Sequence, residues 1–190
     1  FEYSDGRGNV TRISDSISGV NGRQFEYEAT FNQLTRVIDE LGRQTVYDID
    51  PANGNVRSIT EPDPDGSGSQ TAPVTQYTYT AQGLVDRVTD PLGRITNYEY
   101  NNIRGLIRVV LAEGTGDQAI LQYSYDAAGN IAAFTDGRGS ITRFYYDNFN
   151  RLTRVEQPDP DGTGTLSAPI TRFFYDLNGN LIRVQDARNN

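Results

Sequence analysis

The order of apolar, polar and turn-forming residues returns eight times along the chain. Each copy has an aromatic strand that closes on tyrosine, then a turn, then an apolar residue followed three places later by another, as in Tyr125-Asp-Ala-Ala-Gly129-Asn-Ile131-Ala-Ala-Phe134. The closing residues are Tyr3, Tyr27, Tyr47, Tyr79, Tyr100, Tyr125, Tyr146 and Tyr175. Self-similarity with a core unit of about 20 residues predicts a repeat array.

The residues before each closing tyrosine alternate with period two. The segment Thr142-Arg-Phe144-Tyr-Tyr146 is typical, and it places a threonine and two aromatic residues on one face of a strand. No window has an apolar stripe of helical period. The sequence therefore predicts an all-β array of antiparallel hairpins, in which tyrosine rings pack on a half-buried face and their hydroxyls reach water.

Aspartate and glycine recur at both turns of the repeat. Asp90-Pro91-Leu92-Gly93 and Asp176-Leu-Asn-Gly179 have the preferences of a type I turn. An aspartate at the start of such a turn accepts a hydrogen bond from the amide two residues on. We therefore interpret the repeated aspartates as turn formers rather than catalytic acids.

The i, i+3 spacing of the apolar pair does not fit a regular strand. Ile131 and Phe134 would lie on opposite faces of an uninterrupted strand. Either a β-bulge resets the alternation in each repeat, or both faces of the sheet are partly buried. The sequence leaves these alternatives open.

A longer period groups the short repeats in fours. The insertion that begins at Pro62 returns almost letter for letter at Pro158, which is 96 residues later. We expect one array over residues 1–190, made of two super-repeats at approximately 1–94 and 97–190. Because Phe1 falls within an aromatic strand and neither end resembles a cap, we expect the chain to be an excerpt of a longer array.

The two insertions contain the only candidate ligand chemistry. Oxygen-bearing residues alternate along each of them, as they do in short loops that wrap Ca²⁺. The glutamate that usually completes such a loop is absent, since Val74 and Ile170 stand there. A solvated loop is the competing interpretation. The candidate ligands are Asp63, Asp65, Ser67 and Ser69 in the first insertion, and Asp159, Asp161, Thr163 and Thr165 in the second.

Composition excludes several classes of function. The 190 residues contain no His or Cys, which removes the common general base, thiol nucleophile and zinc ligands. The net charge of −8 opposes binding to nucleic acid, and no apolar run is long enough to span a membrane. We therefore expect no enzyme activity and no cofactor other than Ca²⁺.

The repeat resembles the YD repeat of the RHS family, which includes the shell subunits of Tc toxins and the teneurins. The best matches are Tyr125-Asp126-Ala-Ala-Gly129-Asn130-Ile131, Tyr175-Asp176-Leu-Asn-Gly179-Asn180-Leu181 and Asp90-Pro91-Leu92-Gly93-Arg94-Ile-Thr96. The resemblance implies a long antiparallel β strip wound as a spiral into a hollow shell or tube. In family members such a shell often surrounds a toxic C-terminal domain.

Three functions are compatible with these observations. The first is a structural element of an extracellular or cell-surface tube or fibre, which associates with itself or continues into neighbouring repeats. The second is the wall of an RHS-type shell that encapsulates a toxin. The third is adhesion to a cell surface or to glycans through the tyrosine face and the repeated loops.

Overall fold

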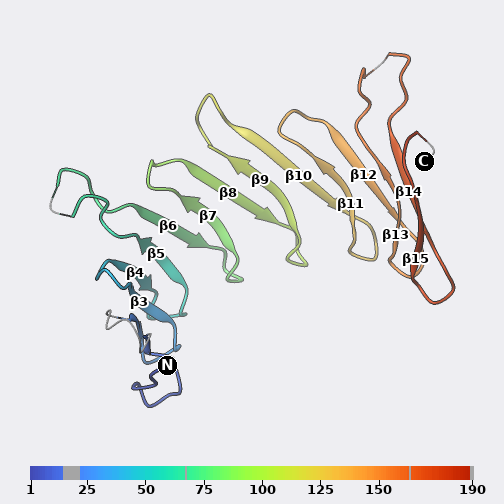
Figure 1. The fold of residues 1–190 in the computed structure, drawn as a ribbon. Coiled ribbons are helices and arrows are strands. Elements are labelled where there is room, and N and C mark those ends of the chain that lie inside the picture. Colours follow the sequence, from blue (N-terminus) through green and yellow to red (C-terminus); the bar gives the residue numbers. More distant parts are fainter. Residues whose placement is uncertain (15–21, 67, 163, 189–190) are drawn as a thin grey trace. The chain divides into compact units, whose positions relative to one another are not determined.

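The computed structural model describes residues 1–14, 22–66, 68–162 and 164–188 (Figure 1). Contacts divide the chain into two compact units, Phe1–Ile95 and Thr96–Asn190. The strands of the first unit are β1 (Arg12–Ile13), β2 (Arg23–Tyr27), β3 (Leu34–Ile38), β4 (Gln44–Ile49), β5 (Val56–Thr60), β6 (Val74–Tyr79) and β7 (Val85–Thr89). The strands of the second unit are β8 (Ile95–Tyr100), β9 (Leu106–Leu111), β10 (Ala119–Tyr125), β11 (Ile131–Thr135), β12 (Ile141–Tyr146), β13 (Leu152–Glu156), β14 (Ile170–Tyr175) and β15 (Leu181–Gln185). The first residue of β8, Ile95, is the last residue of the first unit.

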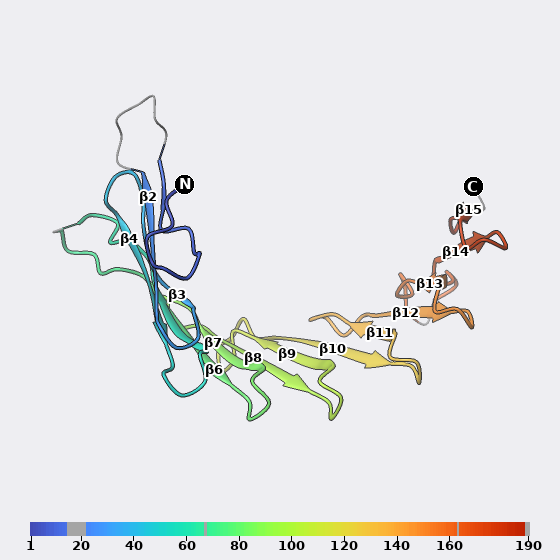
Figure 2. The same cartoon turned by 90° about the horizontal axis from the view of Figure 1, so that it is seen from below.

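Within each unit the strands pair in the order in which they follow one another along the chain. Every pair is antiparallel, from β1 to β7 in the first unit and from β8 to β15 in the second. No helix occurs among the described residues, and each unit forms a single layer of strands (Figure 2). The predicted all-β array of antiparallel hairpins is confirmed.

Each hairpin that closes at the repeated turn contains a β-bulge. In the β10–β11 hairpin Tyr125 faces Ile131 and Ser124 faces Ala133, so that Ala132 is the extra residue. The same register shift occurs in the other six hairpins of this kind. The bulge brings Ile131 and Phe134 onto the face of Tyr123 and Tyr125. Of the two alternatives for the i, i+3 spacing, the bulge is therefore correct.

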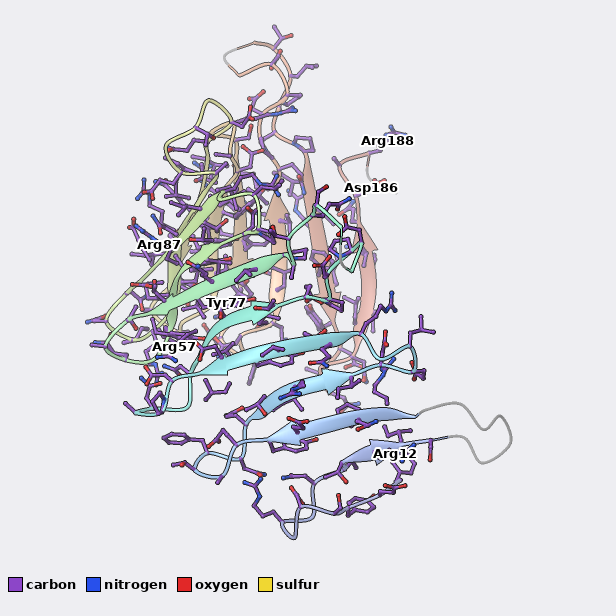
Figure 3. All side chains as sticks on the ribbon, turned by 90° about the vertical axis from the view of Figure 1, so that its left-hand side faces the viewer. Arg12, Arg57, Tyr77, Arg87, Asp186 and Arg188 are labelled. Carbon is purple, nitrogen blue, oxygen red and sulfur yellow. The ribbon has the colours of Figure 1, made fainter. Side chains whose placement is uncertain are left out.

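The two faces of the sheet differ in chemistry. One face carries the aromatic residues and the apolar pairs, such as Tyr123 opposite Phe134, whose ring centroids are 5.2 Å apart. The other face carries mainly polar and charged residues. Figure 3 labels Tyr77 of the first face and Arg57, which bonds to Asp48 on the second. Only Val109 and Val110 are buried among the described hydrophobic residues, because nothing within a unit covers either face.

The register corrects one residue of the repeat pattern. Tyr47 faces Ile59, whereas Ile49 faces Val56 and so takes the position that closing tyrosines occupy elsewhere. The turn that follows is one residue longer, since the Asp50 amide donates to the carbonyl of Asn55 at 2.8 Å. The sequence pattern assigned Tyr47 to the closing position because it is aromatic and lies only two residues from Ile49, close to the expected spacing.

Candidate functional site

Five of the closing tyrosines join their own hairpin to the preceding part of the chain. Four of their hydroxyls donate to the carbonyl of the first residue in the preceding return strand, and that of Tyr27 donates to the carbonyl of Val10, which precedes β1. None of the five is left to water, contrary to what the sequence suggested. The observed donor–acceptor distances are Tyr27 to Val10, 3.1 Å; Tyr79 to Val56, 2.7 Å; Tyr125 to Leu106, 2.7 Å; Tyr146 to Ile131, 3.1 Å; and Tyr175 to Leu152, 2.8 Å.

These hydroxyl contacts lie where the ladder between hairpins ends. The β5–β6 pairing ends at Ser58 and Gln76, and beyond it the Tyr79 hydroxyl reaches the carbonyl of Val56. Burial raises the pKa of the Tyr79 and Tyr146 hydroxyls. The sequence shows the recurrence of tyrosine, but it does not show which carbonyl accepts from it, because that depends on the bulged register.

The repeated aspartates form the turns, as predicted. The Asp126 carboxylate accepts from the amides of Ala128 and Asn130, both at 2.9 Å, and from the Asn130 side chain at 3.1 Å. Hydrogen bonds from the side chain and amide of Asn130 lower the pKa of Asp126. The Asn130 side chain also donates to Asn150 Oδ1 at 3.0 Å, which links two successive turns.

The acidic loops fold back on their own backbone. The Asp65 amide donates to Asp63 Oδ1 at 3.2 Å, and Asp65 Oδ2 accepts from the Gln70 amide at 3.1 Å. A Cβ at Gly68 would lie 2.0 Å from Asp65 Oδ2, so this arrangement requires glycine.

The second loop repeats this arrangement. The Asp161 amide donates to Asp159 Oδ1 at 3.2 Å, and Asp161 Oδ2 accepts from the Leu166 amide at 3.1 Å. The hydrogen bond from the Leu166 amide is the largest cause of a lowered pKa at Asp161.

The structure brings Asp63 close to Asp65, and Asp159 close to Asp161, but among the described residues it places no third acidic residue with either pair. Within the described ranges, no group of three or more acidic residues could hold a metal ion. Ser67 and Thr163 lie outside the described residues, and Ser69 and Thr165 are exposed. Calcium binding stays a prediction, which calorimetric titration of the full chain with Ca²⁺ would test.

Comparison with known families is decisive for the second half of the chain. The family model described as the teneurin YD-shell matches residues 94–190, which is more than half of the sequence. The chain belongs to the YD-shell family. It is therefore a structural, shell-like repeat segment, and the bulged hairpins with their tyrosine contacts are this chain's version of the YD repeat.

Solved structures share the fold of this YD-shell segment. A crystal structure of TcdB2–TccC3 without its hypervariable C-terminal region matches with a TM-score of 0.69 and 19% identity over 88% of this chain and 9% of that chain. The Tc holotoxin pore of Photorhabdus luminescens matches with a TM-score of 0.67 and 21% identity over 87% of this chain and 9% of that chain. The segment thus spans about a tenth of the chains it matches. No curated protein matches it.

The described part of the chain contains no helix that is long and apolar enough to cross a membrane.

Proposed function

We propose that the chain forms part of the wall of a closed YD-repeat shell in a secreted or cell-surface protein, and that it has no catalytic role. The observation that carries this proposal is the bulge that recurs in every hairpin closed by the repeated turn. A bulge bends its strand and increases the local twist. Its regular recurrence supplies the steady curvature that a closed wall needs.

The contacts between hairpins also suit a wall. Tyrosine hydroxyls hold one hairpin to the next beyond the end of the ladder, as between Tyr175 and Leu152. Side chains also link neighbouring turns, as between Asn130 and Asn150. These contacts resist separation of hairpins at the turn edge of the sheet.

Encapsulation of a toxic C-terminal domain is the more specific form of the proposal. The solved relatives with the same fold are components of Tc toxin complexes, and their names supply the analogy. A fibre or open tube is the second candidate, because the loops at Pro62 and Pro158 repeat at 96 residues, as an axial period would require. Glycan adhesion has less support, since hydrogen bonds to backbone carbonyls occupy five of the tyrosine hydroxyls.

Electron microscopy of the native full-length protein tests the proposal. We expect closed, hollow particles, and mass spectrometry of those particles should recover a C-terminal fragment as cargo. Continuous filaments with an axial period of one super-repeat would instead support the fibre. Closed particles without cargo would retain the wall function and remove encapsulation.

A further inference from the structure

One face of the second unit has a cluster of arginines and aromatic rings on the side away from the repeated tyrosines. The cluster comprises alternate residues of four neighbouring strands, β12 to β15. We call it the arginine face, and its members are Arg143, Tyr145, Arg154, Glu156, Arg172, Phe174 and Arg183. Four arginines and one glutamate give this face a net charge of +3, although the whole chain carries −8.

Two of these arginines lie flat against aromatic rings. The guanidinium carbon of Arg154 is 3.6 Å from the ring centroid of Tyr145, and that of Arg183 is 3.9 Å from the ring centroid of Phe174. Each contact joins residues that face each other across adjacent strands. A stacked guanidinium keeps its edge free to donate two parallel hydrogen bonds to a carboxylate.

The face already holds one carboxylate of its own. Glu156 Oε2 accepts from Arg154 and from the Tyr145 hydroxyl, both at 3.2 Å, and Glu156 Oε1 lies 3.8 Å from Arg143. The Glu156 carboxylate therefore neutralises part of the positive charge of Arg143 and Arg154 on β12 and β13.

In the other half of the face, Asp186 lines a pocket together with Arg172, but neither Arg172 nor Arg183 forms an ion pair within the described residues. Arg172 lies directly opposite Arg154 on the neighbouring strand, where like charges repel. Arg172 is exposed, and its guanidinium makes no hydrogen bond or ion pair within the described part of the chain. A second carboxylate between these two arginines would complete the arrangement that Glu156 begins.

The first unit shows that the fold does not require this cluster. In its matching hairpins Asp48 faces Ser58, Ser58 faces Gln76 and Thr78 faces Arg87. The second unit has Tyr145, Arg154, Arg172, Phe174 and Arg183 at the corresponding places in the register. The same backbone therefore carries a polar, nearly neutral face in one unit and a cationic, aromatic face in the other.

We propose that the arginine face binds an acidic polypeptide segment of a partner protein through its carboxylates. Arg154 and Arg172 lie on adjacent strands, so their spacing suits neighbouring acidic side chains, and the rings of Tyr145 and Phe174 contact the stems of those side chains. The chemistry favours a carboxylate over a phosphate, because Arg154 and the Tyr145 hydroxyl already bind the carboxylate of Glu156 in this way. The inference holds whether the array closes into a shell or extends as a fibre.

Fluorescence anisotropy with a short labelled oligoglutamate peptide tests this binding on the full chain at low salt. We expect saturable binding that weakens as salt is added. The double variant Arg154→Ser with Arg172→Gln introduces the residues of the first unit at these positions. We expect it to retain the native circular dichroism spectrum and to bind about tenfold more weakly or worse.

The matched control removes two other arginines of the second unit. Arg138 and Arg188 are exposed on turns, and neither lies on the arginine face. The Arg138→Gln with Arg188→Gln variant should bind the peptide almost as well as the unchanged protein. An equal loss in both double variants would overturn the proposal, since binding would then depend on overall charge alone.

A graft into the first unit provides an independent gain-of-function test. Asp48→Tyr, Ser58→Arg and Gln76→Arg together rebuild the central row of the arginine face there. We expect this variant to have a second peptide-binding site, so that two peptides bind per chain instead of one. An unchanged stoichiometry with a folded variant, or tighter binding of oligothymidine than of oligoglutamate, contradicts the proposal.

Discussion

The hairpins β4–β5 and β12–β13 occupy the same place in the two units, and they share a bulged register although their side-chain chemistry differs and the turn of the first is one residue longer. Both contain a bulge next to the closing residue, between Asp48 and Ile49 in the first hairpin and between Tyr145 and Tyr146 in the second. The first closes on an isoleucine that has no hydroxyl. The second closes on a tyrosine that bonds to the carbonyl of Ile131.

The cross-strand contacts on the opposite face differ as well. In the first hairpin, Nε and Nη2 of Arg57 donate to the two carboxylate oxygens of Asp48 at 2.9 and 2.7 Å. In the second hairpin, the guanidinium of Arg154 stacks on the Tyr145 ring. The arginine of the first hairpin is the extra residue of the bulge, whereas that of the second faces Tyr145 directly in the register. The turn and the bulge therefore fix the geometry, and the residues on the polar face are free to serve other purposes.

The largest effect should come from the turn of the first hairpin. Gly54 has φ 79°, and a Cβ added to it would lie 2.7 Å from Cγ of the Phe31 ring. Gly54→Ala should lower the free energy of unfolding by about 1–2 kcal/mol for the left-handed backbone, with a further loss from the displaced ring. Urea denaturation of the full chain measures it.

The equivalent position of the second hairpin supplies the control. Asn150 already adopts φ 59°, and its side chain accepts a hydrogen bond from Asn130. Asn150→Gly should change the free energy of unfolding by less than about 1 kcal/mol, because relief of backbone strain offsets the lost hydrogen bond. A larger loss for Asn150→Gly than for Gly54→Ala would contradict the idea that the turn geometry dominates.

The closing residue should have the next largest effect. Tyr146→Phe removes only the hydroxyl that donates to Ile131, and it should cost about 1 kcal/mol, the usual net contribution of one hydrogen bond. Ile49→Tyr should act in the opposite direction by placing a hydroxyl near the carbonyl of Leu34. Urea denaturation of both variants measures these changes, and no gain from Ile49→Tyr would show that the first hairpin has adapted to isoleucine.

The sequence predicted the repeat, the strands and the aspartate turns because each depends on neighbouring residues. Asp126 finds its hydrogen-bond partners within four residues. The acceptor of each tyrosine hydroxyl lies 15 to 23 residues away and depends on the register, so it could not be read from the pattern. The arginine face also escaped sequence reasoning, because its residues alternate on four strands and meet only after pairing.

Acid should weaken the second hairpin through its turn aspartate. Hydrogen bonds from the side chain and amide of Arg151 lower the pKa of Asp147 despite the opposing effect of burial. A carboxylate with a lowered pKa stabilises the fold above its unfolded value of 3.8, and that contribution is lost as pH falls through the folded value. The melting-temperature difference between the unchanged chain and Asp147→Asn should therefore be larger at pH 7 than at pH 3.

Asp117→Asn is the matched control for the acid prediction. The Asp117 carboxylate accepts no hydrogen bond within the described part of the chain, so the substitution should have little effect at either pH. If the difference for Asp147→Asn stayed constant from pH 7 to pH 3, the turn carboxylate would not be responsible for the acid sensitivity.

The smallest effects should come from the cross-strand contacts that the two arginines make on the polar face. A double-mutant cycle with Tyr145→Leu and Arg154→Met should give a coupling energy of about 0.5–1 kcal/mol, and Tyr145→Phe should preserve it because the ring remains. The corresponding cycle for Asp48 and Arg57 should give a weaker coupling that fades in high salt, since both side chains are about half exposed. Cycles measured at low and high salt separate the two contacts. The coupling between Asp48 and Arg57 could instead resist salt and exceed the coupling between Tyr145 and Arg154. That result would contradict the prediction and show that the ion pair of the first unit stabilises the fold more than the stacked contact of the second.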